Sequence, residues 1–438
     1  MTIGLLGERR FAPLFWCQFC SALSDNFMKN ALAILILFGI GSVRPIENAG
    51  TAALLVTLSS VTLIAPFFFL SALGGELADK YDKARVARVI KLAEIPVAVL
   101  AAVGFVLHSV PILFAALLGF GVLAALFGPL KYGILPEKLA TSELAQGNAL
   151  VEAATFLAIL LGTIGGGLAV AYTGGATLVI GVVLALAIAC WVMALAIPEH
   201  GAAAPRIAIT ANPLASTFAL LRELKREPRL RAGAHVTSWF WMVGVLVMSL
   251  LPVLVKDVIG GGESVYTLAL TAFVIGIATG SALAAGASHG RPNLAVVPIG
   301  AIGMAVAALA LAALAYAGTP AARPAGILDV LGSFEGVALL LALVALSISG
   351  GLYVVPAFAV VQSWAPPDAR ARVVASVNVL NAAYMTGGGA LLAALQAAGT
   401  PVWMLLAAIG IATLAVHSVL VRPWVEGATA PAPEAISP

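Results

Sequence analysis

The chain has 438 residues, of which 61% are hydrophobic and only 10% are charged. Because soluble domains carry about 25% charged residues, this composition excludes a water-soluble globular protein and makes a lipid bilayer the expected solvent. The formal net charge of +3 is too small to indicate a nucleic-acid partner, so the placement of the charges along the chain carries more information than their sum.

Twelve apolar runs are long enough to span a bilayer, which takes about 20 residues per helix. Only helices and closed barrels satisfy the backbone in lipid, and these runs lack the two-residue alternation of barrel strands, so we predict an all-α membrane protein. The first run is longer than the apolar part of a signal peptide and is expected to remain as the first span. The predicted spans are 12–40, 51–74, 86–107, 110–131, 145–172, 176–197, 231–258, 265–288, 293–318, 334–358, 371–397 and 400–422.

The basic residues are distributed unevenly between the two sides of this topology. Nineteen of the 23 Lys and Arg residues fall on one side, and Lys91 is counted with the basic loop there. Arg44, Lys256 and Arg323 fall on the other side, and Lys29 lies within the first span. The positive-inside rule therefore places the basic side and both termini in the cytoplasm.

The longest loop on the basic side, 198–230, divides the predicted spans into two sets of six. Its segment STFALLRELKREP (216–228) predicts a short amphipathic helix on the cytoplasmic surface, and a tether between the two bundles is its favoured role. The tail is rich in Ala and Pro and is expected to be disordered. The predicted organisation is a six-helix bundle at 1–197, a linker at 198–230, a second six-helix bundle at 231–425 and a tail at 426–438.

The first span contains an acid, a base and several amides where lipid is expected. Asp25 lies near its middle, and Lys29 follows one turn later on the same face, so the pair would partly neutralise itself. Asn26 and Gln18 add further polar groups. Charges at membrane depth cost several kcal/mol and usually face a cavity or a partner. We therefore expect this span to form a cavity wall, the alternative being a polar staple between helices.

The loop after the second span, GGELADKYDKAR (74–85), resembles the signature G-x-L-A-D-[RK]-x-x-[RK]-[RK] of the major facilitator superfamily. Asp82 stands where that signature has a glycine. The resemblance implies a gate in which Asp79 faces the start of the eleventh span, where a helix N-terminus favours a carboxylate. The alternative is an ordinary basic loop. The gating motif that the resemblance implies consists of Gly75, Asp79, Lys80, Lys83 and Arg85.

The two halves of the chain repeat each other weakly. Glycine triplets occur at 165–167 and 387–389, and Asn148 and Asn378 occupy matching places upstream of them. Duplicated six-helix units are common in secondary transporters, which hold substrate between the halves. For the glycines themselves, close helix packing in lipid is the favoured role, and it fits a transporter whose halves must close tightly. The repeat supports a fold of two pseudo-symmetric bundles.

A second polar cluster surrounds the end of the fourth span and the start of the fifth. Lys131 follows Pro129 and is either a cavity residue or a lysine that reaches the membrane surface. Glu152 and Asn148 are four residues apart and share one helix face. A buried glutamate needs a cation, a proton or a substrate amine, so we expect Glu152 and Asp25 to converge on a wet chamber between the halves.

Several segments resemble the bacterial lysophospholipid transporter family of the major facilitator superfamily. They are QFCSALSDN (18–26), KYGILPEKL (131–139), GNALVEAATFLAILLGTIGGGLA (147–169), TSWFWMVG (237–244) and GGLYVVP (350–356). The resemblance implies a secondary transporter that moves lysophospholipids, chiefly lysophosphatidylethanolamine, across the bacterial inner membrane for re-acylation. No fused acyltransferase domain follows the last span, so a separate re-acylation enzyme is the expected partner. Lys29 is not part of the family pattern.

The resemblance carries functional roles to Asp25, Asn26, Lys131 and Glu152. Lys131 or Lys29 would bind the phosphate of the headgroup, and Asp25 or Glu152 its amine. The acyl chain would lie along apolar wall near Trp239. We expect a monomer with no cofactor and no metal. The predicted substrate-binding residues are Gln18, Asp25, Asn26, Lys29, Lys131, Asn148, Glu152, Trp239, Asn378 and Asn381.

Two other functions were weighed against lipid transport. The sequence has no His-x4-Asp pair, no Gly-Lys dipeptide for a nucleotide-binding loop and no metal-ligand cluster, so an enzyme or an ATP-driven pump is not expected. Cys17 and Cys20 form a CxxC within the first span, where two small apolar residues are the expected interpretation. A proton-coupled exporter of drugs or metabolites on the same fold stays open, with Asp25 and Glu152 as proton carriers.

Overall fold

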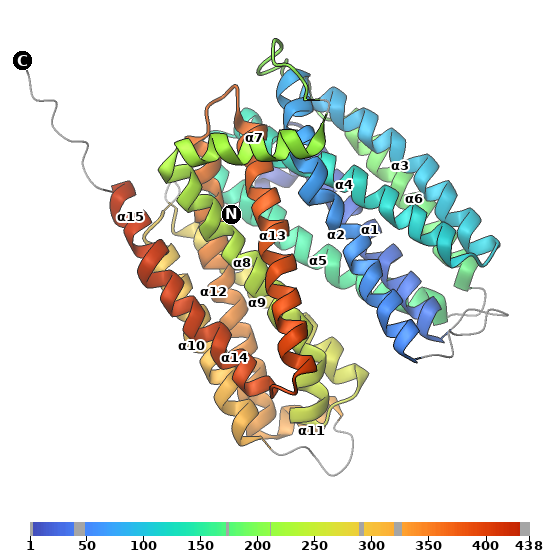
Figure 1. Cartoon of the computed structure of the whole chain (residues 1–438), viewed down its shortest axis with the longest axis vertical. Coiled ribbons are helices and arrows are strands. Elements are labelled where there is room, and N and C mark those ends of the chain that lie inside the picture. The colour runs from blue at the N-terminus through green and yellow to red at the C-terminus, as the bar shows by residue number, and fades with distance from the viewer. Residues whose placement is uncertain are drawn as a thin grey trace, which may run out of the picture.

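Long helices make up almost all of the computed structural model, which describes residues 3–38, 49–171, 175–210, 212–288, 293–318 and 326–429 (Figure 1). In those ranges the long helices are α1 (Ala12–Phe38), α2 (Ala49–Lys80), α3 (Lys83–Val106), α4 (Val110–Lys138), α5 (Leu144–Ala171), α6 (Gly175–Leu195), α8 (Pro228–Val253), α9 (Glu263–Gly286), α10 (Val296–Ala317), α12 (Phe334–Trp364), α13 (Arg370–Ala397) and α14 (Val402–Val416). The short ones are η1 (Ile3–Gly7), α7 (Pro213–Arg226), η2 (Leu254–Ile259), α11 (Ile327–Gly332), η3 (His417–Val421) and α15 (Arg422–Thr429). The π-helical turns η2 and η3 continue α8 and α14. With the twelve long helices, the predicted all-α fold with twelve spanning segments is confirmed.

Ten helices in the described part of the chain are both long and apolar enough to cross a membrane. The two long helices outside that set are α1 and α13. Polar side chains lower their hydropathy, among them Asp25 and Lys29 in α1 and Asn378 and Asn381 in α13. Since such groups are costly in lipid, these two helices must turn their polar faces toward the inside of the molecule.

The helices form two groups that we call the first bundle (α1–α6) and the second bundle (α8–α14). In the first bundle, α1 packs on α5 and α6, and α4 packs on α2 and α3. In the second, α12 packs on α9 and α10, and α13 packs on α8. The bundles meet along two seams, α2 against α13 and α5 against α9. They approach each other most closely at one end, beneath α7, and diverge toward the other (Figure 1).

Glycines allow the closest approaches between these helices. A Cβ at Gly162 of α5 would lie 2.7 Å from the carbonyl oxygen of Leu23 in α1. Across the seam, a Cβ at Gly75 would lie 2.9 Å from the Cβ of Ala375. Of the two glycine triplets, 165–167 packs against α1, whereas Cβ atoms at Gly387 and Gly389 would meet no atom of the described structure within 4 Å. Close packing therefore explains the first triplet better than the second.

Several helices run about two turns beyond their predicted ends. α2 ends at Lys80, α4 at Lys138 and α12 at Trp364, instead of at 74, 131 and 358. Lys131 consequently lies inside α4 and not at its end. Lys91, which the sequence assigned to the basic loop, lies inside α3 and is completely buried. These extensions form what we call the basic end, the end of the bundles that carries Lys80, Arg85, Arg88 and Arg372.

The tail differs from the prediction at its start. α15 runs to Thr429, because Trp424 is buried and donates from Nε1 to the carbonyl oxygen of Arg229 at 3.0 Å. Residues 430–438 lie outside the described residues, as do Arg44, Arg291 and Arg323.

The loop before α7 is fastened to the basic end by Asp82. This carboxylate accepts hydrogen bonds from the backbone of Ala84 at 2.9 Å and Arg85 at 3.2 Å, which caps the N-terminus of α3. It also accepts from the backbone of His200 at 2.8 Å and Gly201 at 2.5 Å. Burial alone would raise the pKa of Asp82, but these N–H donors, His200 and Gly201 first, lower it below its ordinary value. The departure from the signature glycine thus has a structural role.

We predict that Asp82→Ala lowers the free energy of unfolding by about 1–2 kcal/mol, the cost of a lost helix cap. Because the folded-state pKa is depressed, the ionised carboxylate stabilises the fold above the unfolded-state pKa of about 3.9, and this contribution is lost as the pH falls through the folded-state pKa. Thermal unfolding in detergent at pH 7 and at progressively lower pH would measure it. The difference in unfolding temperature between wild type and variant should narrow at low pH, and a difference that stays constant would contradict the capping role of Asp82. Asp368→Ala, which removes an exposed carboxylate at the same end, is the control.

Candidate functional site

A cavity of about 230 Å³ lies between the bundles, where α1, α2, α4 and α5 face α8, α12 and α13. Its lining combines polar residues with aromatic and aliphatic ones, contributed by both bundles. The polar lining consists of Gln18, Ser21, Asp25, Lys131, Thr155, Asn378 and Asn381. The main apolar lining consists of Ile64, Phe67, Phe127, Tyr132, Trp241, Phe358 and Met385. The cavity therefore has the mixed character of a site for an amphiphile.

Asp25 and Lys131 are the two charged residues in this lining. Neither forms a hydrogen bond or an ion pair with any described residue, and the Lys131 ammonium lies 4.8 Å from the centroid of the Tyr132 ring. Gln18 is buried and its Nε2 has no partner among the described atoms. The cavity thus offers the Asp25 carboxylate, the Lys131 ammonium and the N–H groups of the Gln18 amide to a ligand.

The side chains of Asn26, Lys29 and Asn30 in α1 bond within that helix or to α5. Asn26 donates to the carbonyl oxygen of Ala22 at 2.9 Å and accepts from the Lys29 ammonium at 3.3 Å. Asn30 donates to the carbonyl oxygen of Thr163 in α5. Asp25 and Lys29 form no direct ion pair in the described structure, and the Lys29 ammonium donates to Asn26 instead. Both predicted functions of α1 are present: one face lines a cavity and another staples helices together.

Glu152 does not reach the cavity, although it was expected there. It is 1% exposed and lies behind Tyr132, whose hydroxyl donates to its Oε1 at 3.1 Å. Its Oε2 has no partner in the described structure. The Lys131 ammonium lies 4.8 Å from the centroid of the same Tyr132 ring. The geometry places Glu152 behind Tyr132 and removes it from direct contact with a ligand.

A second buried ion pair stands behind the cavity wall. Lys91 pairs with Glu94 one turn along α3, and its ammonium donates to Ser21 Oγ at 2.8 Å. It also lies 3.9 Å from the centroid of the Phe127 ring. Ser21 and Phe127 both line the cavity, so this pair supports its wall. Sequence reasoning missed it, although the i, i+3 spacing of opposite charges within an apolar run was an available signal.

Of the second-bundle residues predicted to bind substrate, the two asparagines line the cavity and the tryptophan does not. Trp239 was expected beside the substrate, but its Nε1 donates to Thr413 Oγ1 in α14 at 3.2 Å, inside the second bundle. Trp241 lines the cavity instead, because two residues along a helix turn the side chain by about 200°. Asn378 and Asn381 both line the cavity, as expected.

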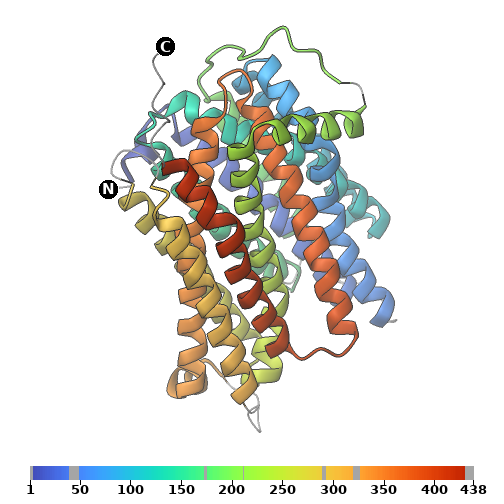
Figure 2. The ribbon, with the colours of Figure 1, turned by 60° about the vertical axis from the view of Figure 1, so that its left-hand side comes forward.

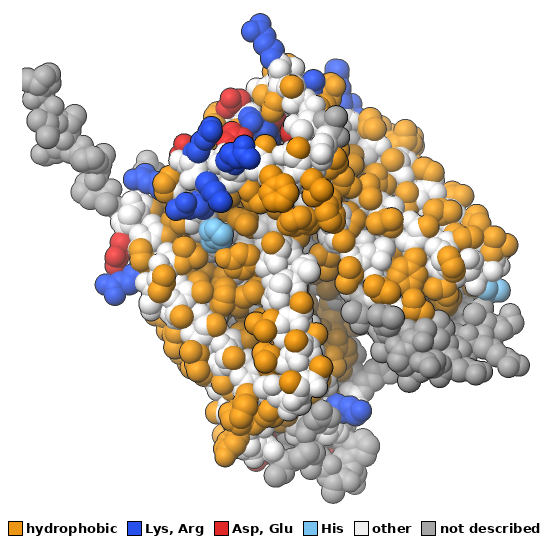
Figure 3. Space-filling model, in the orientation of Figure 1, with side chains coloured by type: hydrophobic (Ala, Val, Ile, Leu, Met, Phe, Trp, Pro, Cys, Tyr) orange, Lys and Arg blue, Asp and Glu red, His pale blue; other side chains and the backbone are white. Residues whose placement is uncertain are grey.

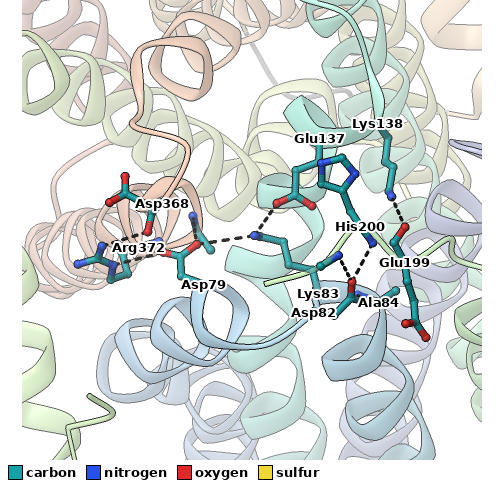
Figure 4. Close-up of polar contacts among 12 residues, drawn as sticks. Asp79, Asp82, Lys83, Ala84, Glu137, Lys138, Glu199, His200, Asp368 and Arg372 are labelled. Atoms are coloured by element: carbon teal, nitrogen blue, oxygen red, sulfur yellow. Dashed lines mark hydrogen bonds and ion pairs between the residues drawn. The ribbon is translucent and has the colours of Figure 1, made fainter. Parts of the chain in front are cut away.

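Asp79 ties the bundles together at the basic end. The completely buried carboxylate accepts from the backbone N–H groups of Ala371 and Arg372, each at 3.1 Å, at the N-terminus of α13. The Arg372 guanidinium adds a contact at 3.3 Å. On the other side, Lys83 lies 3.8 Å from Asp79 and 2.6 Å from Glu137 (Figure 4). Asp79 therefore faces the start of the eleventh span, as the motif predicted.

The other members of the motif lie around this tie. Gly75 lets α13 approach α2, as described above. Arg85 pairs with Glu199 at 2.9 Å on the first bundle's own loop. Lys80 forms no hydrogen bond or ion pair with the described residues, and its ammonium lies 5.9 Å from the centroid of the Tyr81 ring. Arg85 and Lys80 thus do not bridge the bundles.

A second tie lies nearer the cavity. Asn148 of α5 and Gln362 of α12 exchange hydrogen bonds through both amides, at 2.8 and 3.1 Å, and are at most 1% exposed. Beside them, the Tyr132 and Phe358 rings meet edge to face with centroids 4.6 Å apart. Asn148 was expected to bind substrate, whereas the structure places it in this inter-bundle pair and not in the cavity lining. Together with Asp79, this pair closes the molecule at the basic end.

We predict that Asn148→Ala opens the basic end, because it leaves the Gln362 amide buried without a partner at a cost of about 1–3 kcal/mol to the closed form. A single cysteine at Ala382, in a chain whose native cysteines are replaced, should then react at least about fivefold faster with an impermeant maleimide added from the basic side. Gln362→Ala should accelerate the maleimide reaction to a similar extent, and the double variant should react little faster than either single variant. Ser249→Ala, at an exposed serine of α8, is the control. Equal labelling rates in all variants would contradict a gating role.

The chain was compared with known families and relatives. A sequence model of the Major Facilitator Superfamily matches residues 14–338. The lysophospholipid transporter LplT of Cronobacter sakazakii is 33% identical over 285 residues, which cover 64% of this chain and 67% of that protein. LplT of Yersinia enterocolitica is 33% identical over 313 residues, which cover 69% of this chain and 72% of that protein.

Two solved structures have the same fold. The human organic anion transporter MFSD10 aligns with a TM-score of 0.72 at 16% identity, over 93% of this chain and 99% of that one. The transporter FucP in its outward conformation aligns with a TM-score of 0.69 at 13% identity, over 95% and 99% of the two chains. At such identities these likenesses bear on the fold alone.

Proposed function

Because this chain belongs to the major facilitator superfamily, and within it to the bacterial lysophospholipid transporters, we propose that it carries lysophospholipids across the bacterial inner membrane by alternating access. Lysophosphatidylethanolamine is the headgroup that we propose, with a separate enzyme to re-acylate it. The two bundles would rock about the cavity and expose it to one side of the membrane at a time.

The unpaired charges of the cavity carry this proposal. A phosphoethanolamine headgroup has one phosphate and one ammonium, and it leaves water only if both find partners. Lys131 supplies the cation and Asp25 the anion, and neither forms a hydrogen bond or an ion pair with a described residue. Lys29 and Glu152 are unsuitable, since the first bonds to Asn26 and the second lies behind Tyr132.

The size of the cavity indicates where the acyl chain lies. About 230 Å³ is below the roughly 300–1,000 Å³ of sites that enclose drug-sized ligands, so the cavity accommodates the headgroup and not the whole lipid. Ile64 and Phe67 on α2 and Met385 on α13 make the wall apolar beside the α2–α13 seam. We propose that the acyl chain leaves the cavity along this seam and extends into the bilayer.

We further propose that the basic end is cytoplasmic, as the positive-inside rule indicates. The Asp79 and Asn148 ties then close the cytoplasmic side, so the structure corresponds to an outward-facing form. Substrate would reach the cytoplasmic leaflet only after both ties break.

A proton-coupled exporter is the second candidate, and one observation favours it. The Asp25 carboxylate faces the cavity without an ion pair or hydrogen bond in the described structure, which also suits a group that binds and releases a proton. An exporter would lower the accumulation of a cationic dye in cells, whereas a lysophospholipid transporter would leave it unchanged.

We predict that Lys131→Met and Asp25→Asn each lower the initial rate of labelled lysophosphatidylethanolamine uptake into proteoliposomes about 10- to 100-fold. Each loses a hydrogen bond to a charged group, worth about 1.5–3 kcal/mol. Asp25→Asn should retain more activity toward a lysophospholipid whose headgroup lacks the amine.

Lys29→Met is the matched control and should transport nearly as well as wild type, because its ammonium does not line the cavity. Normal uptake by Lys131→Met combined with loss of uptake by Lys29→Met would refute the assignment. Thermal unfolding of each variant would separate loss of binding from loss of fold.

A further inference from the structure

The short helix α7 crosses the basic ends of both bundles. Its axis is roughly perpendicular to the long helices, and it lies at the periphery of the molecule (Figures 1 and 2). Toward the first bundle, Ser216 donates to Glu76 at 2.6 Å and Thr217 donates to the carbonyl oxygen of Phe68 at 3.3 Å. Toward the second bundle, Glu223 accepts from Arg372 at 3.4 Å. α7 therefore fastens α2 and α13 to each other.

The apolar side of this fastening fills the same seam. Leu220 of α7 forms a small buried cluster with Ala72 of α2 and Ala375 of α13. Arg372 bonds at once to Asp79 and to Glu223, so the gate and α7 share one side chain. Separation of α2 from α13 would disrupt these contacts, which makes α7 a strap over the gate.

The outer face of α7 has no partner in the described structure. Leu214 and Phe218, one turn apart, are 43% and 57% exposed. Arg222, Lys225 and Arg226 follow, all exposed and without a hydrogen bond or ion pair to a described residue. Basic and apolar side chains lie next to each other on this part of the surface (Figure 3).

This arrangement fits one kind of partner, an anionic bilayer surface. Helices that lie in a membrane interface bury an apolar face below the headgroups and place basic residues among anionic phosphates. α7 lies at the ends of the long helices and at the periphery of the molecule. In a bilayer it would therefore lie at the level where the spans leave the hydrocarbon region, next to lipid. Its basic residues outnumber its one acid, Glu223, which already pairs with Arg372.

We infer that α7 binds anionic phospholipid headgroups of the surrounding leaflet, with Leu214 and Phe218 inserted below Arg222, Lys225 and Arg226, and thereby holds the α2–α13 seam closed. Anionic lipid then favours the form that is closed at the basic end. The inference depends on the membrane location of the chain and not on the identity of its substrate.

The test uses the full-length protein in vesicles of phosphatidylcholine with and without phosphatidylglycerol. The readout is the maleimide reaction of the cysteine at Ala382 from the basic side. Phosphatidylglycerol should slow the reaction several-fold, and high salt should reverse the effect, since it screens the headgroup charge. The triple variant R222Q/K225Q/R226Q should not respond. Arg206→Gln, which neutralises an exposed residue of the preceding loop, should respond as wild type does.

A second measurement does not depend on gating. A spin label at Phe218→Cys should be shielded from a water-soluble nickel reagent and accessible to oxygen in vesicles that contain phosphatidylglycerol. A nickel-accessible label in those vesicles would overturn the proposal and would indicate a protein partner for this face. Equal reaction rates in the two kinds of vesicle, or a lipid response retained by the triple variant, would also overturn it.

Discussion

The cost of an unpaired polar group in lipid determines how this molecule is built. A chain with this composition can place charges at membrane depth only where protein or an enclosed wet cavity receives them. α1 meets the constraint in two directions, since Asn26 and Asn30 bond within the helix and to α5, while Asp25 faces the cavity. The two helices that are too polar to count as ordinary spans, α1 and α13, both place polar side chains on the cavity.

The charged side chains within the bundles are of two kinds: some have protein partners, and others are unpaired beside the cavity. Lys91 and Glu94 form an ion pair behind the cavity wall, and the Glu152 carboxylate accepts a hydrogen bond from the Tyr132 hydroxyl. Breaking such a buried pair is strongly unfavourable, whereas a charge beside a cavity can be solvated until a ligand arrives. Asp25 and Lys131 line the cavity without an ion pair in the described structure, so a ligand can supply their counter-charges. This distinguishes them from the paired charges, which have a structural role.

The sequence predicted the helices well because helix length and hydropathy are local properties. It also predicted that Asp25 and Asn378 face the cavity, because a charged or amide side chain at membrane depth must find either a cavity or a protein partner. It could not predict which neighbour each face meets. The i, i+4 spacing of Asn148 and Glu152 correctly gave them a common face, but that face packs on Gln362 and Tyr132 and not on the cavity. The sequence groups Lys91 with the basic loop because of its charge, although Lys91 lies within the predicted span 86–107.

The two ties at the basic end differ in physical character, and this difference bears on how the gate opens. Asp79 binds backbone N–H groups at a helix N-terminus, so its interaction depends on the orientation of α13 as a whole. The Asn148–Gln362 pair depends on two side chains beside Tyr132, which itself contacts the cavity. Tyr132 contacts Glu152 and Phe358, which lie one turn along the same helices from Asn148 and Gln362, so the inner tie and the cavity lining are close neighbours in the fold.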